Sequence, residues 1–257
     1  MAKTIDQAVR EVCLSFPEAE EYVSHGSPNF RVKGGRTFAT YVVNHHGDGR
    51  VALWLKSPDG AQEHHVANAP KHFFVPPYVG PSGWLGVELD KGIAWKRIAE
   101  LVREAYENVA PPKLAAKIGK TIAITPPTAT MKAEERDRLA APRTAKIVEK
   151  LRAICLALPE TRGTKQFGAP VWQAGTKTFA IAYDYGEGPM LGFWVGVDQQ
   201  GLYTADPRYS IPKYMGHNGW IALAVGKRCD WAEIESLAHA SYRHFALKRM
   251  LKALDAA

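Results

Sequence analysis

Cationic side chains at predicted hairpins are the first residues of this sequence that could do chemistry. Phosphate groups are held by lysine and arginine side chains that project from one surface, and such contacts tolerate any base sequence. Ordinary solubilising charge is the alternative reading of the same residues. The nucleic-acid-binding candidates are Arg31, Lys33, Arg36, Lys165, Lys177, Arg208, Lys213, Lys227 and Arg228.

Aromatic residues beside glycine-rich turns are the second set. Residues 76–84 and 212–220 both read Pro-x-Tyr-x-Gly-x-x-Gly-Trp. Indole rings stack on planar groups, including bases, although core packing is the alternative for a tryptophan. A pocket or contact surface at these turns would be lined by Tyr78, Trp84, Tyr214, His217, Asn218 and Trp220.

Catalytic and metal-binding motifs are missing from the sequence. It contains no nucleophile elbow, P-loop, dinucleotide-binding glycine motif or HExxH. Zinc needs three or four converging ligands, whereas the adjacent pairs His45-His46 and His64-His65 would each offer one ligand if they lay on a strand. We therefore expect no catalytic residues, no metal and no cofactor.

The net charge of +7 is unevenly placed along the chain. Residues 1–110 hold 12 Lys and Arg against 13 Asp and Glu, residues 111–145 hold 7 against 3, and residues 146–257 hold 14 against 10. The basic excess therefore lies in the middle and the second half. Such an asymmetry favours a polyanionic partner, with DNA as the first candidate.

Bulk composition indicates a globular protein. The 257 residues are 46% apolar and 23% charged, and no apolar run approaches the length of about 20 residues that a membrane span needs. The three cysteines form no CxxC pair, and the N-terminus has no signal-peptide core, so we expect free thiols and a soluble, cytoplasmic protein.

An internal repeat organises the chain. Arg10-x-x-Cys13-Leu14-x-x-Pro17-Glu18 matches Arg152-x-x-Cys155-Leu156-x-x-Pro159-Glu160, and the Gly-x-x-Gly-Trp turns match without a gap. Between them, Leu53-Trp54-Leu55 aligns with Phe193-Trp194-Val195, which predicts that Trp54 and Trp194 are equivalent. We expect one domain at residues 1–110, a basic linker at 111–143 and a second domain at 144–257.

Both copies show the same periodicity and turn signals. A helix before Pro17 or Pro159 precedes three strands, near residues 29–32, 36–43 and 51–55 in the first copy and 171–174, 177–183 and 190–195 in the second. A short helix, two more strands and an amphipathic helix follow. The predicted class is α+β, with the order α-β-β-β-α-β-β-α and an antiparallel sheet that carries helices on one face.

The order of these blocks resembles the MmcQ/YjbR-like family. The resemblance rests on Leu-x-x-Pro-Glu, the Gly-x-Pro entry to the first strand, Thr-Phe-Ala, and the late Tyr-x-Gly-x-x-Gly-Trp block, once in each copy. It implies a two-layer fold similar to secretion chaperones and a role in DNA binding through paired hairpin wings. It brings no catalytic residues to carry over.

Two functions stay open at this point. The first is a non-enzymatic DNA-binding protein, and the second is a small-molecule or protein-interaction module in which two copies imitate a homodimer within one chain. The first copy has Gly80-Pro81-Ser82-Gly83 at its late turn, whereas the second has His217 and Asn218. We therefore expect the second copy to carry more of the function.

Overall fold

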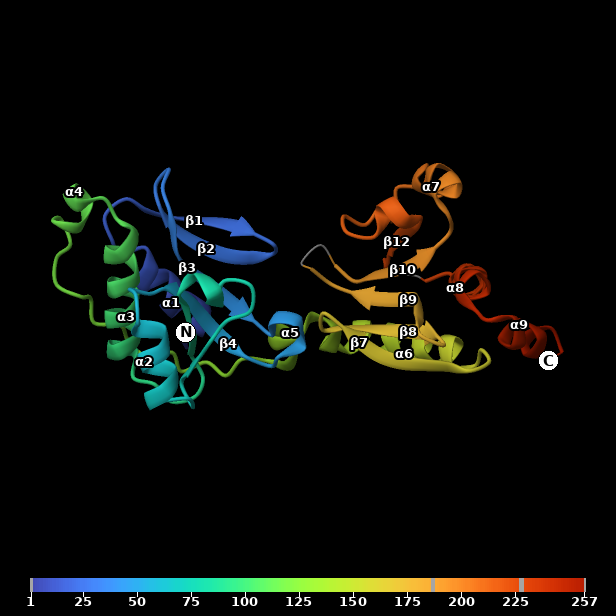
Figure 1. Ribbon diagram of the computed structural model, residues 1–257, viewed down its shortest axis with the longest axis horizontal. Helices are drawn as coiled ribbons and strands as arrows, with labels where there is room; N and C mark the ends of the chain where they lie inside the picture. Colours follow the sequence, from blue (N-terminus) through green and yellow to red (C-terminus); the bar gives the residue numbers. More distant parts are fainter. Residues whose placement is uncertain (1, 186–187, 227–228, 257) are drawn as a thin grey trace. The chain divides into compact units, whose positions relative to one another are not determined.

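The chain forms two separate units. The computed structural model describes residues 2–185, 188–226 and 229–256, so Lys227 and Arg228 lie outside the described residues. Unit 1 spans residues 1–132 and unit 2 spans residues 133–257 (Figure 1).

Unit 1 is one antiparallel sheet with helices. The sheet has the order β1-β2-β3-β4-β6-β5. Its strands are β1 (Ala19–Ser24), β2 (Ser27–Val32), β3 (Thr37–Val43), β4 (Val51–Lys56), β5 (Phe73–Phe74) and β6 (Trp84–Glu88). Its helices are α1 (Ile5–Cys13), α2 (Ala61–Asn68), α3 (Trp95–Val109) and the short α4 (Pro112–Ala115), and the 3₁₀ turns are η1 (His45–Gly47) and η2 (Gly80–Ser82).

Unit 2 repeats this arrangement. Its sheet has the order β11-β12-β10-β9-β8-β7. The strands are β7 (Thr161–Gln166), β8 (Ala169–Ala174), β9 (Lys177–Tyr183), β10 (Met190–Trp194), β11 (Tyr209–Ser210) and β12 (Trp220–Ala224). The helices are α5 (Ala133–Arg136), α6 (Pro142–Leu156), α7 (Val197–Thr204), α8 (Trp231–Phe245) and α9 (Lys248–Asp255), with 3₁₀ turns η3 (Arg138–Ala140) and η4 (Gly216–Asn218).

The α+β class and the antiparallel sheets are confirmed, but the predicted order was one strand short in each copy. Strands β1 and β7 precede the three strands that were predicted, and each pairs with the next strand through a tight turn. The turn residues His25-Gly26 and Phe167-Gly168 all have positive φ, as a two-residue hairpin turn of type I′ requires. Edge strand β7 is polar and exposed, so no alternation of apolar residues marked it.

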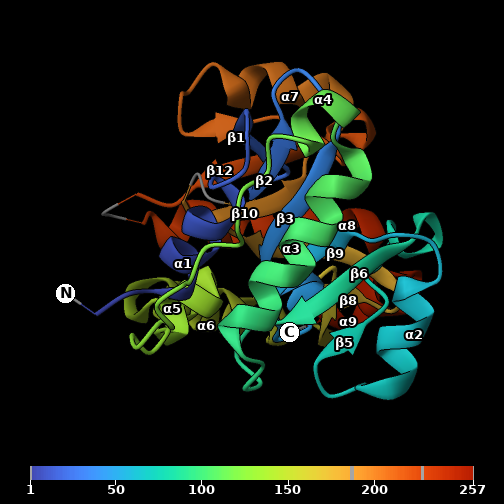
Figure 2. The same ribbon diagram turned by 90° about the vertical axis from the view of Figure 1, so that its left-hand side faces the viewer.

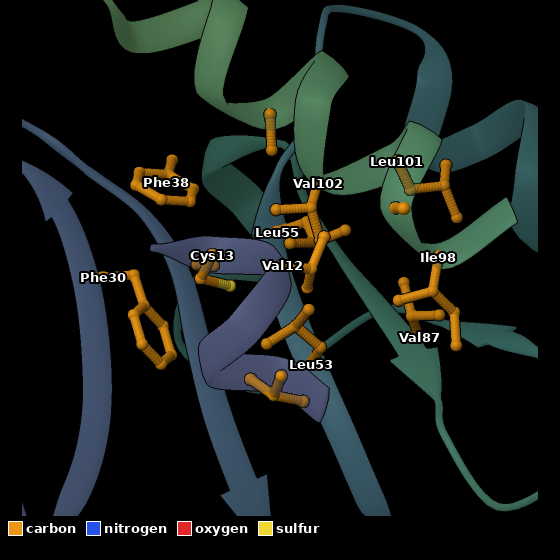
Figure 3. Packing of buried hydrophobic residues seen from close by; sticks show 14 of the residues in the cluster. Val12, Cys13, Phe30, Phe38, Leu53, Leu55, Val87, Ile98, Leu101 and Val102 are labelled. Atoms are coloured by element: carbon orange, nitrogen blue, oxygen red, sulfur yellow. The ribbon is translucent and has the colours of Figure 1, made fainter. Parts of the chain in front are cut away.

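Helices α1 and α3 cover one face of the unit 1 sheet, and Figure 2 looks onto this side with α3 in front of β3. Thr4 caps α1 by accepting from the backbone of Gln7, which fixes the start of an amphipathic helix. Val12 and Cys13 then meet β-strand residues such as Leu53 in a continuous buried cluster (Figure 3). Burial raises the pKa of the Cys13 thiol well above its ordinary value, which makes it a core residue rather than a nucleophile.

The segment between the predicted domains divides between the two units. Residues 111–132 fold onto unit 1, where Leu114 and Ile124 are buried in its core and the backbone of Thr128 donates to the Lys3 carbonyl. Residues 133–143 belong to unit 2 and contain α5, η3 and the start of α6. Residues 131–139 contain only α5 and the first residues of η3.

None of the helices within the described residues is both long and apolar enough to cross a membrane.

Candidate functional site in an aromatic cleft of unit 2

Unit 2 contains a cleft of about 320 Å³ between the ends of three strands and the end of α8. We call this the aromatic cleft. It is lined by Lys177, Thr178, Trp194, Asn218, Trp220, His244 and Phe245. Four of these seven side chains are aromatic rings, and neither a carboxylate nor a thiol is among them, so the cleft combines flat apolar walls with positive charge at its rim.

The Gly216–Trp220 turn forms one wall and is held from below by a buried glutamine. Gln200 on α7 donates from Nε2 to the carbonyl oxygens of Gly216 and Trp220, both at 2.7 Å. The turn ends at Gly219 with φ of 88°, a conformation that favours glycine. The Trp194 indole donates from Nε1 to the Asn218 carbonyl at 2.8 Å, which ties the turn to the end of β10.

The end of α8 forms the opposite wall. The buried Ser241 accepts from the Trp194 backbone and donates to the Phe179 carbonyl, so α8 is fixed against β9 and β10. One turn later, the His244 ring stacks on the Trp194 indole with centroids 3.3 Å apart and planes within 13°. Partial burial lowers the pKa of His244 below its ordinary value, which favours the neutral ring in this stack.

Strand register corrects the predicted equivalence of Trp54 and Trp194. In unit 1, Trp54 pairs with Gly86 and Lys56 pairs with Trp84. In unit 2, Trp194 pairs with Trp220, the residue that matches Trp84. Lys56 is therefore the structural counterpart of Trp194, because the alignment of the two tryptophans was displaced by two residues.

Unit 1 places other side chains at the corresponding positions. Lys56 Nζ donates to the Ser82 carbonyl, just as Trp194 donates to the carbonyl of Asn218. The counterpart of His244 is Asn108, whose side chain donates to the carbonyl oxygens of Lys56 and Ser57. In unit 1, two polar side chains that donate hydrogen bonds to backbone carbonyls thus take the place of the stacked rings of unit 2.

The structure places only some of the predicted pocket residues at the aromatic cleft. Asn218 and Trp220 line the aromatic cleft. Tyr214 and His217 are exposed on the same loop and do not line it. In unit 1, Trp84 is half-buried and packs on the outer face of the sheet, whereas Tyr78 is 68% exposed and contacts His46.

Two of the cationic candidates, Arg31 and Arg208, are paired with carboxylates. Arg31 is paired with Glu20 at 2.7 Å, and Arg208 binds both Asp206 and Glu233. Hydrogen bonds from Arg208 hold the pKa of Glu233 below its ordinary value, so this arginine is committed within the chain. Among the described residues, no ion pair is seen for the exposed side chains of Lys33, Arg36, Lys165, Lys177 and Lys213, although the charge of Lys33 helps to lower the pKa of Glu20.

Asp230 and Glu233 have the sequence spacing of a capping box at the start of α8. Asp230 does cap α8 by accepting from the backbone of Ala232 and Glu233. The Glu233 carboxylate instead accepts from Arg208 and from the Tyr209 hydroxyl. The cap therefore rests on Asp230 alone.

The histidine pair of unit 1 lies in a turn and not on a strand. His45 and His46 sit in η1, between β3 and β4, with ring centroids 4.0 Å apart, so the argument for opposite faces of a strand does not apply to them. The Tyr78 hydroxyl lies 3.1 Å from His46 Nε2, and the His45 ring lies edge-on to Trp54. Across the described part of the chain, no three His, Cys, Asp or Glu side chains gather as a metal site would require.

Four lining residues, Thr178, Trp194, His244 and Phe245, were not among the site residues predicted from the sequence. The supporting Gln200 did leave a signal, because Gln62 occupies the matching place in the first copy and bonds to the carbonyl oxygens of Gly80 and Trp84. A buried polar residue retained in both copies indicates a backbone that needs its hydrogen bonds.

Comparison with known proteins agrees with the two-unit architecture. A search of the curated proteins found no match. Among solved structures, the chain is similar to the crystal structure of Deinococcus radiodurans protein DR2400, described as a DUF419 domain, at 22% identity over 41% of this chain and 77% of that chain, with a TM-score of 0.34. The family model described as YjbR matches residues 14–108 and again residues 156–244. The chain therefore belongs to the YjbR family and carries two YjbR domains in tandem.

Proposed function

We propose that this protein binds a small planar ligand in the aromatic cleft of unit 2. The observation that carries the proposal is the opening between the Trp194–His244 stack and the Gly216–Trp220 turn. Ligand sites are concave, mostly apolar and fitted with a few polar groups that fix orientation, and Lys177, Thr178 and Asn218 supply such groups here. The presence of Lys56 and Asn108 in unit 1, at the positions of Trp194 and His244, supports the second domain as the one that binds the ligand.

A thermal-shift screen of the full chain tests this function. The panel contains planar molecules (nucleotides, aromatic carboxylates and flavin-like rings) and non-planar controls such as sugars. A ligand present at 100 times its Kd stabilises the folded protein by about 2.7 kcal/mol, so a planar ligand should raise the Tm of unit 2 by several degrees.

His244→Ala should reduce this shift, because His244 is an exposed wall of the cleft whose loss removes a stacking surface and leaves the core intact. The matched control is Asn108→Ala at the corresponding position of unit 1, which should retain the full shift. A panel without any shift, or a shift of unchanged size in His244→Ala, would refute the proposed site.

Nucleic-acid binding is a second candidate function, favoured by a specific observation. Lys165, Lys177 and Lys213 of unit 2 are exposed and form no ion pair with any described carboxylate. Each of these lysines can neutralise a DNA phosphate and release the counterions condensed on it. A cation already paired with a carboxylate within the chain contributes little to this release.

The expected result is binding of a short DNA duplex that weakens about 40-fold between roughly 50 and 200 mM salt, as three phosphate contacts imply. Fluorescence anisotropy measures it. Replacing the three lysines by glutamine should remove the salt dependence, and Arg31→Gln should change the affinity less than twofold because Glu20 already neutralises Arg31. Equal losses from both variants, or no binding at low salt, would exclude this function.

A further inference from the structure

In the Trp194–His244 stack, the His244 ring is the one that a ligand can reach. Trp194 is partly covered, whereas His244 is exposed and lines the cleft. A second aromatic pair, Trp220 and Phe245, also lines the cleft, with ring centroids 6.0 Å apart and ring planes within 28°. A flat heteroaromatic ring that enters the cleft therefore meets aromatic faces, and stacking of a base on an aromatic side chain contributes about 1–3 kcal/mol.

Two polar side chains of the cleft, Lys177 and Asn218, are available to a ligand, whereas the Thr178 hydroxyl already donates to Gln166 Oε1 at 3.2 Å. No described carboxylate pairs with the Lys177 ammonium, and no residue among the cleft walls would repel an anion. Within the described residues, the Asn218 carboxamide makes no hydrogen bond. The bond from Trp194 goes to the backbone carbonyl of Asn218 and not to its side chain. A carboxamide offers a donor and an acceptor side by side, which is the pattern presented by the edge of a nucleobase.

From these groups we infer that the cleft binds a nucleotide unit, meaning a heteroaromatic base that carries a phosphate. This inference rests on the function proposed above and specifies the ligand class of the same site. The base stacks on His244, the Asn218 carboxamide bonds to its edge, and Lys177 binds the phosphate. A volume of about 320 Å³ lies at the lower end of the range for ligand sites, which fits one nucleotide and not two stacked bases.

The test compares AMP with adenosine by isothermal titration calorimetry on the full chain. AMP should bind more tightly than adenosine, because only AMP carries the phosphate. Lys177→Gln should remove this preference and leave adenosine unchanged. His244→Ala should weaken both ligands by about 5- to 100-fold through the loss of stacking. Lys146→Gln removes an exposed lysine of α6 that does not line the cleft and should keep the full preference for AMP.

A third ligand, a short oligothymidylate, distinguishes the two sources of a nucleotide unit. Binding of the oligonucleotide more tightly than AMP, with the same dependence on His244 and Lys177, assigns the site to single-stranded nucleic acid; the reverse order assigns it to a free nucleotide. Equal binding of AMP and adenosine, or no binding of any of the three while another planar molecule gives a shift that depends on His244, overturns this inference and leaves the proposed function standing.

Discussion

Gly219→Ala is expected to destabilise unit 2 by about 2–5 kcal/mol, since it combines a left-handed backbone with a steric overlap. Gly219 has φ of 88°, where a Cβ atom is unfavourable. An added Cβ would also lie 2.8 Å from the Cα of Gly196 and 2.9 Å from the Val197 nitrogen. Backbone atoms cannot move aside as a side chain can, so the turn that carries Trp220 must shift.

The repeat supplies a matched control for this substitution. Gly83 occupies the same place in unit 1 with φ of 75°, but an added Cβ there meets only Lys56 Nζ, at 3.5 Å. Gly83→Ala should therefore cost only the conformational penalty of about 1–2 kcal/mol. Urea unfolding of each variant measures the difference. Equal losses for Gly83→Ala and Gly219→Ala would contradict the claim that contact with Gly196 is what separates them.

Gln200→Leu is expected to lower the stability of unit 2 by about 2–4 kcal/mol. The Gln200 side chain is 6% exposed, and its Nε2 is the donor to the buried carbonyl oxygens of Gly216 and Trp220. Leucine fills a similar volume but has no donor, and each buried polar group left without a partner costs about 1–3 kcal/mol. The variant should also lose ligand binding, because the same bonds hold the wall of the cleft.

Gln199→Leu on the same helix is the control, since Gln199 is exposed and its replacement should change stability by less than about 0.5 kcal/mol. Gln62→Leu should reproduce the loss of stability in unit 1 but leave ligand binding to unit 2 intact. Thermal unfolding and the calorimetric titration measure the two effects separately. Gln200→Leu with unchanged stability would show that the turn does not depend on these bonds.

Both predictions treat the two copies as one backbone with different side chains. The same glutamine, the same pair of glycines and the same terminal tryptophan build the late turn in each unit. The units diverge at the positions of Trp194 and His244, where unit 1 has Lys56 and Asn108. The second copy thus carries stacked rings on a framework where the first copy has side chains that bond to its own backbone.

Elements that depend on neighbouring residues alone could be predicted from the sequence. Periodic apolar residues predicted the helices, and Val9 and Val12 are buried as that pattern requires. Glycine spacing located the late turns, and rare residues in register located the repeat. These features follow from the chemistry of neighbouring residues, so no knowledge of distant contacts was needed.

Only the tertiary structure decided which distant side chains meet. The sequence did not predict β7, because an exposed edge strand needs no apolar alternation. Trp54 was aligned with Trp194 because the two residues are identical, and only the strand pairing reveals that this alignment is displaced by two residues. Nor could the sequence bring His244 onto Trp194, since that contact depends on the packing of α8 against β10 through Ser241. The cationic candidates show the same limit: both Arg208 and Lys177 are cations in the sequence, but the fold pairs Arg208 with two carboxylates, whereas no described carboxylate pairs with Lys177 at the cleft.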